Sequence, residues 1–196
     1  GDGSGRVGLR MAFSQKMLDQ DAVQLIPVDS RVVHMVYEVL GSFPIIDSYC
    51  ERIKSFKDRG MSIGPTDPVA TQLHEVLSAL TISCTQMSPE AVAEWDPQTL
   101  PEGKAHWHKQ ALMRELKLLD MLLWLLTSVE RSGISLEQLS NAENATLMTI
   151  HQLAYICLTR AFMDSRRSEL YLAEMSAAKW GRHSTTEMYL EQVRNQ

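Results

Sequence analysis

The sequence predicts an all-α fold, either a helical bundle or an armadillo-like α-solenoid. Three observations support this prediction. Helix formers dominate the composition, which includes 11 methionines, and alternating β-branched runs are lacking. Apolar residues recur at spacings of three and four, as on one face of a helix. Finally, proline and glycine, with Asp-Pro and Ser-Pro pairs, occur where helices of ordinary length would begin and end.

The length and composition predict one domain. A chain of 196 residues with 44% hydrophobic content can build one sizeable core. Residues 1–27 are expected to be an irregular N-terminal segment or a cloning remnant, since the chain begins Gly-Asp-Gly-Ser-Gly. Residues 28–196 are expected to form a single helical domain.

The first half of that domain contains four predicted helices. One covers residues 30–40 and is expected to end at the sequence Gly-Ser-Phe-Pro, and the next covers 45–57. Residues 60–66, rich in glycine, serine and proline, form a loop. Two further helices are predicted over 68–85 and 89–95. Each has proline at its first position and a capping Asp67 or Ser88 before it.

The longest helix is predicted over residues 104–131, ending at Gly133. It carries two adjacent apolar stripes, so it should be enclosed by neighbouring helices, with Trp124 in the core. The stripes are Leu112, Leu116, Leu119, Leu123 and Leu126, and beside them Leu118, Leu122, Leu125 and Val129.

Three more helices are predicted toward the C-terminus. They cover residues 141–163 and 168–180 and a last segment starting near Ser184. The polar sequence Asp-Ser-Arg-Arg at 164–167 separates the first two.

Charge and cysteine content exclude several classes of protein. The net charge of −5 argues against a general nucleic-acid binder, which would carry a basic surface. The most apolar stretch, 116–126, contains two charged residues and is about half the length of a membrane span, so no membrane insertion is expected. Cys50, Cys84 and Cys157 form no CxxC pair and are expected to be buried thiols in a reducing compartment.

Motifs of catalysis and cofactor binding are absent from the sequence. It has no GxSxG, HExxH, Walker or GxGxxG pattern, so we expect no enzyme, no cofactor and no metal. His106-Trp107-His108 is the nearest approach to a metal motif, but residues two apart on a helix point to different sides. The other histidines are expected to be hydrogen-bonded structural residues: His34, His74, His151 and His183.

Two basic groups are the candidate binding residues. Lys104, Lys109, Arg114 and Lys117 lie on the longest predicted helix, and Arg166-Arg167 lie in a break between helices. Arginines at such a break can bind a phosphate with paired hydrogen bonds. The alternative is an ordinary solvated helix face.

Two stretches resemble a known family. Residues 109–126 read KQALMRELKLLDMLLWLL, and residues 165–174 read SRRSELYLAE. They are similar to the RQxLxRE segment with its leucine-rich helix, and to the GNRxNxxYLA segment, of the RIH domain. This helical domain is shared by ryanodine receptors and inositol trisphosphate receptors. In order and separation the two stretches also fit, and the resemblance covers roughly residues 70–180.

The resemblance implies a non-catalytic cytosolic helical arm of an intracellular calcium-release channel. Such an arm relays ligand-induced movement toward the pore, in a parent protein of the endoplasmic reticulum or a related calcium store. The implied partners are other domains of the same long chain and neighbouring subunits.

A second implication concerns inositol trisphosphate. The matching segments keep basic residues at Lys109, Arg114, Arg166 and Arg167, which are the expected ligand-binding or interface residues. Ala111 and Ser165 replace a basic residue and a tyrosine of the ligand-binding family copy, so any binding should be weak.

Two alternatives remain open. One is a general helical scaffold or adaptor for protein–protein interaction, which needs only the helical pattern. The other is a helical enzyme that uses the scattered histidines or Arg166-Arg167, and it requires a concave pocket that gathers them.

Overall fold

The computed structural model describes residues 28–59, 63–139 and 141–180. Residues 1–27, His183 and the helix predicted from Ser184 therefore lie outside the described residues. The chain divides into two compact units, residues 1–38 and 39–196.

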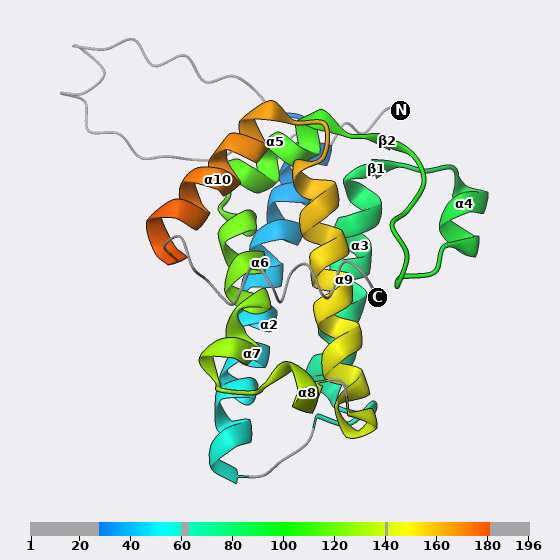
Figure 1. Ribbon diagram of the computed structural model, residues 1–196. Coiled ribbons are helices and arrows are strands. Elements are labelled where there is room, and N and C mark those ends of the chain that lie inside the picture. The colour runs from blue at the N-terminus through cyan, green and yellow to red at the C-terminus, as the bar shows by residue number, and fades with distance from the viewer. Residues whose placement is uncertain (1–27, 60–62, 140, 181–196) are drawn as a thin grey trace, which may run out of the picture. The chain divides into compact units, whose positions relative to one another are not determined.

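The described residues are almost entirely helical, which confirms the prediction of an all-α fold (Figure 1). The elements in chain order are α2 (Ser30–Arg59), α3 (Pro68–Ser83), β1 (Thr85–Gln86), α4 (Pro89–Glu94), β2 (Lys104–Ala105), α5 (Trp107–Glu115), α6 (Leu118–Leu126), α7 (Ser128–Arg131), α8 (Leu136–Leu139), the 3-10 turn η1 (Ala142–Asn144), α9 (Ala145–Phe162) and α10 (Arg166–Trp180).

The predicted break at residues 41–44 is wrong, because α2 continues through Pro44 as one helix. Proline removes one backbone hydrogen bond and usually kinks or ends a helix. Here the Ser42 hydroxyl donates to the Val39 carbonyl over 2.6 Å, inside the turn that proline disturbs. Buried Ile46 and Tyr49 lie just beyond it, so packing on both sides of Pro44 keeps the helix continuous.

The predicted starts of α3 and α4 are confirmed. The Asp67 carboxylate accepts hydrogen bonds from the backbone N–H groups of Val69 and Ala70, at 2.9 and 3.1 Å. The Ser88 hydroxyl accepts from the Ala91 N–H at 3.2 Å. These caps satisfy N–H groups that have no partner within the helix itself.

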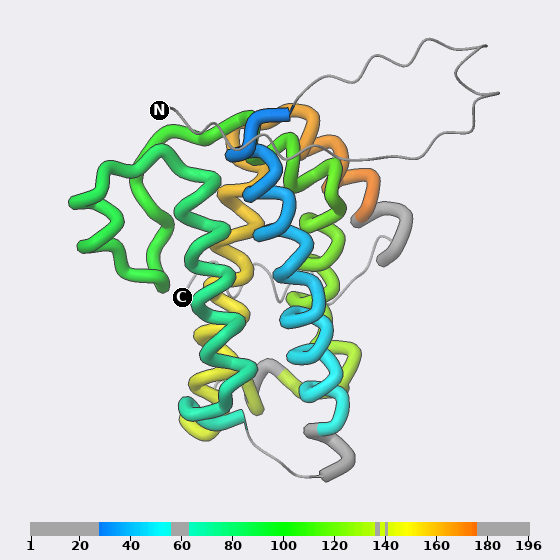
Figure 2. The backbone as a smooth tube through the Cα atoms, turned by 180° about the vertical axis from the view of Figure 1, so that it is seen from behind, coloured from blue at the N-terminus to red at the C-terminus, as the bar shows by residue number. Residues whose placement is uncertain are grey.

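The second unit is a bundle around one core. α3 and α6 both pack against α9, and the later part of α2 lies between α3 and α6 (Figures 1 and 2). The core is built mainly from leucine, isoleucine and other apolar side chains of these four helices, and Met113 of α5 and Val129 of α7 join it. Cys50, Cys84 and Cys157 are buried and free, as predicted.

The core contains a buried histidine. His151 on α9 is fully buried, and its Nδ1 lies 2.8 Å from the Leu147 carbonyl oxygen. Its Nε2 lies 3.5 Å from the Ser128 hydroxyl, and its ring centroid is 6.4 Å from that of Tyr49 on α2. Burial lowers the pKa of His151 from 6.5 to about 4, so the core contains a neutral imidazole.

The prediction of one long helix over 104–131 is wrong. The segment begins in the short strand β2 and then forms α5, α6 and α7, with Lys117 in the left-handed region at φ 67° between α5 and α6. The second apolar stripe is buried throughout, whereas Leu112 and Leu116 of the first stripe are only half-buried. On α5, Met113 is the residue buried in the core that α6 fills.

Trp124 does not lie in the core as the sequence predicts, because 38% of its surface is exposed. The Arg131 guanidinium stacks on its ring at 3.1 Å from the ring centroid, and Lys54 Nζ lies 5.6 Å away on α2. Arg131 also donates to the Trp124 carbonyl over 2.6 Å. The indole is therefore covered by two cationic side chains at the surface of the unit.

The remaining observed helices differ from the predicted helices mainly in the residues at which they begin and end. The helix predicted over 141–163 is a 3-10 turn followed by α9, and α10 begins at Arg166, two residues earlier than expected. Asp164 takes a left-handed conformation at φ 60° between α9 and α10. The polar sequence at 164–167 thus provides both the break and the first turn of α10.

Candidate functional site

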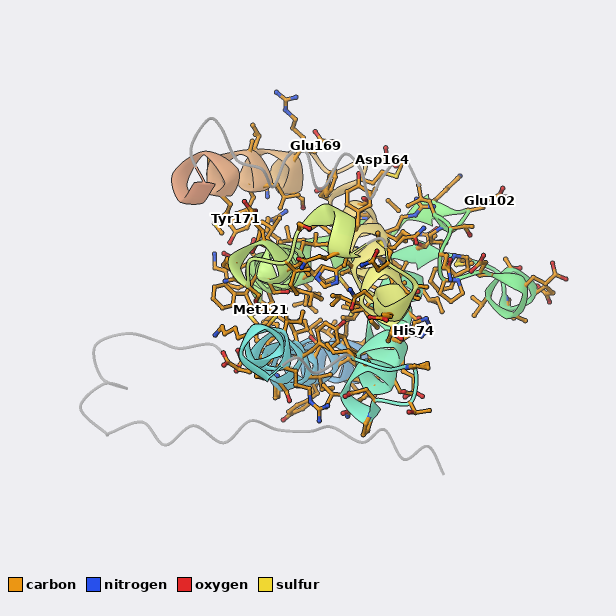
Figure 3. The ribbon with its side chains drawn as sticks, turned by 60° about the horizontal axis from the view of Figure 1, so that its bottom comes forward. His74, Glu102, Met121, Asp164, Glu169 and Tyr171 are labelled. Carbon is orange, nitrogen blue, oxygen red and sulfur yellow. The ribbon has the colours of Figure 1, made fainter. Side chains whose placement is uncertain are left out.

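The two segments that resemble the RIH domain meet where α5 and α6 contact α10. Residues from one segment touch residues about 50 positions later in the other. Figure 3 shows Tyr171 of α10 next to α6. This junction is the candidate functional site.

Gln110 fixes α5 against the end of α9. Its side chain is fully buried, and Nε2 donates to the carbonyl oxygens of Arg160 and Met163 at 2.8 and 2.7 Å. The last carbonyls of a helix have no partner within the helix, so this amide caps α9. Its Oε1 has no hydrogen-bond partner among the described residues.

Arg114 is turned inward, toward α10. Only 12% of its side chain is exposed. Its Nη1 donates to the Ser168 hydroxyl over 3.3 Å, and its Nη2 lies 2.9 Å from the Glu115 carboxylate. Ser168 is itself fully buried and accepts a second hydrogen bond from the Ser165 hydroxyl over 3.0 Å. Arg114 therefore links two elements of the chain and has limited capacity left for a ligand.

Lys117, Asp120 and Tyr171 form a second link between the same elements. Lys117 Nζ donates to the Tyr171 hydroxyl over 3.1 Å and lies 4.8 Å from the centre of its ring. The hydroxyl in turn donates to the Asp120 carboxylate. The bond to Tyr171 raises the pKa of Lys117, and burial raises the pKa of Tyr171, so both stay protonated at neutral pH.

The other three predicted site residues are more available to solvent. Arg166 and Arg167 are exposed at the first two positions of α10, and neither side chain makes a hydrogen bond or ion pair with another described residue. Lys109 is half-buried on α5. The structure thus brings Arg114 together with the start of α10, where Arg166 and Arg167 lie, but no contact places Lys109 beside them.

The start of α10 can attract an anion. A helix N-terminus presents free N–H groups and a partial positive charge, and two guanidinium groups are attached there. Arginine is well suited to phosphate because its N–H groups form paired, charged hydrogen bonds.

Sequence reasoning missed Gln110, Ser168 and Tyr171 as contact residues. Each is an ordinary polar residue on a helix, and its role depends on a partner about 50 residues away. The Tyr-Leu-Ala part of the family resemblance is the only signal that could have directed attention to Tyr171.

The histidine motif does not assemble a metal site. Trp107 is 65% exposed and stacks on the His108 ring, with centroids 3.3 Å apart, while His106 is half-buried. Across the described ranges, no three histidine, cysteine, aspartate or glutamate side chains gather closely enough to hold a metal ion.

Comparison with protein-family models and with curated proteins finds no match to this chain. Within residues 28–59, 63–139 and 141–180, no helix combines the length and apolar character needed to cross a membrane.

Proposed function

We propose that the chain is a non-catalytic cytosolic helical arm of an inositol trisphosphate receptor-like calcium-release channel, and that it relays ligand-induced movement toward the pore. The supporting observation is the contact between the two RIH-like segments. Gln110, Arg114 and Tyr171 stand at the Gln, Arg and Tyr of the two family patterns, and each links α5 or α6 to α9 or α10. Residues that hold a domain together are expected to recur in other proteins with the same fold, so these contacts support the resemblance to the RIH domain.

The architecture suits a mechanical role. Helices that pack through buried side chains move as stiff bodies and change between discrete arrangements. Polar contacts between α5, α6 and α10 join elements far apart in sequence, so a movement of α10 would be transmitted to α6.

The proposal is tested on the parent protein. Antibodies against this chain should detect a large protein that stays in microsomal membranes after alkaline extraction, because only integral membrane proteins resist that treatment. Detection of the parent protein in the soluble fraction would contradict the channel arm. A fluorescent calcium assay on vesicles containing the purified parent protein would then measure release directly.

Weak inositol trisphosphate binding is a separate prediction. Calorimetric titration at low salt should give a micromolar dissociation constant, and Arg166→Ala/Arg167→Ala should weaken it about tenfold or more, since each lost charged hydrogen bond costs about 1.5 kcal/mol. Arg31→Ala, an exposed arginine on α2, is the matched control and should bind like the wild type. If no heat is measured at high protein concentration, the chain does not bind inositol trisphosphate. That result would not contradict the proposed channel arm.

A general scaffold or adaptor is the second candidate function. It is favoured by Trp107, a large aromatic side chain stacked against His108 at the surface, as in many protein interfaces. A soluble parent protein in the fractionation experiment would select this candidate.

A further inference from the structure

The break between α5 and α6 is conformationally unusual. Lys117 has φ 67° and ψ 22°, a left-handed conformation that glycine adopts freely and other residues avoid. Among the described residues, Asp164 is the only other non-glycine residue at positive φ. Lys117 contacts α10, and Asp164 lies just before α10, so both unusual residues adjoin the same helix.

The local sequence does not account for this break. Residues 109–126 contain neither glycine nor proline and consist mostly of strong helix formers. No side chain caps the start of α6. The first N–H groups of α6 would gain carbonyl partners if α5 and α6 formed one continuous helix. Local preference thus favours a straight helix, and the bend must be held by contacts from elsewhere in the chain.

Gln110 holds α5 against the end of α9, and α10 adds contacts on both sides of the bend. On the α5 side, Ser168 accepts from Arg114 at 3.3 Å. At the bend itself, the Tyr171 hydroxyl accepts from Lys117 at 3.1 Å, and it donates to Asp120 in the first turn of α6. A single phenol therefore bridges the left-handed residue and the helix that follows it.

We propose that Lys117 is a two-state hinge, bent while α10 is docked and straight when α10 moves away. In the straight state residues 107–126 form one helix, which changes the direction of α5 relative to α6. The hinge adds to the proposed function without depending on it, because it requires only the residues of this chain.

NMR on the full 196-residue chain tests the hinge. Tyr171→Phe removes the bridging hydroxyl and keeps the ring, so the fold should survive. Loss of two charge-assisted hydrogen bonds should raise the straight population about tenfold or more. Relaxation dispersion should then appear at the amides of residues 114–121. If exchange is faster than milliseconds, the Lys117 Cα shift should move toward the right-handed helical value instead.

Glycine substitutions make the test specific. Lys117→Gly added to Tyr171→Phe should suppress the exchange, because glycine removes the strain of the bent state. Asp164→Gly, at the other left-handed position, should leave the exchange unchanged. Tyr155→Phe on α9 is the control for loss of a tyrosine hydroxyl and should behave as the wild type. The hinge is refuted if Tyr171→Phe gives the same dispersion and the same Lys117 shift as Tyr155→Phe. The role of Lys117 is refuted if Asp164→Gly suppresses the exchange as strongly as Lys117→Gly.

Discussion

Acidification from about pH 7 to about pH 4.5 is expected to lower the free energy of unfolding by about 2.5 kcal/mol through His151 alone. The pKa of His151 is about 4 in the folded chain because burial disfavours the charged ring, against 6.5 when it is exposed. Between those two values the unfolded chain binds more protons than the folded chain, so stability rises with pH. The loss begins as the pH falls below about 6.5 and is complete below about 4.

Urea unfolding followed by circular dichroism, at several pH values across that window, measures the effect. His151→Gln keeps a polar side chain that does not titrate, so the pH dependence of its unfolding free energy should be smaller than that of the wild type by about 2.5 kcal/mol. His108→Gln, at an exposed position on α5, is the control for loss of a histidine side chain. Equal pH dependence in the His151→Gln chain and the wild type would show that the ring is not neutral and buried. Carboxylates that titrate in the same range affect all three chains alike.

Truncation of Leu122 is expected to destabilise the fold strongly. Leu122 on α6 is fully buried within the core cluster. Leu122→Ala should lower the free energy of unfolding by about 2–5 kcal/mol, because it removes buried methyl groups and leaves a cavity. Denaturant unfolding monitored by circular dichroism measures this loss, and a large reduction would leave a substantial unfolded fraction at physiological temperature.

Trp124→Ala is the control variant whose unfolding free energy is compared with that of Leu122→Ala. Both residues lie in the same leucine-rich run, and the sequence alone places both in the core. The tryptophan is instead partly exposed beneath Arg131, so its loss should cost about 1–2 kcal/mol, from the cation–π contact and the covered part of the indole. If Trp124→Ala destabilised the chain more than Leu122→Ala, α6 would have to face the core with the tryptophan side instead.

Some residues of the candidate site could be predicted from the sequence and others could not. The residues that could not be predicted act through partners far away in the sequence. Arg114 belongs to a recognisable pattern, and it does contact the start of α10. Lys117 is predicted only as one charge of a basic face, yet its backbone forms the bend and its amine binds Tyr171. Nothing within four residues of Lys117 signals either role.

The sequence by itself determined the all-α fold, the helix starts at Asp67 and Ser88, and the buried stripe that includes Leu122. These features depend on capping, proline placement and helical spacing, which act between residues at most about four apart.

Only the tertiary structure decided that α2 passes through Pro44, that the predicted long helix bends at Lys117, and that Trp124 faces outward. In each case packing or hydrogen bonding with a distant element outweighs the local preference. An amphipathic helix in a protein gains most of its stability from packing against neighbouring elements. Those elements therefore determine where the helix bends and which face it buries.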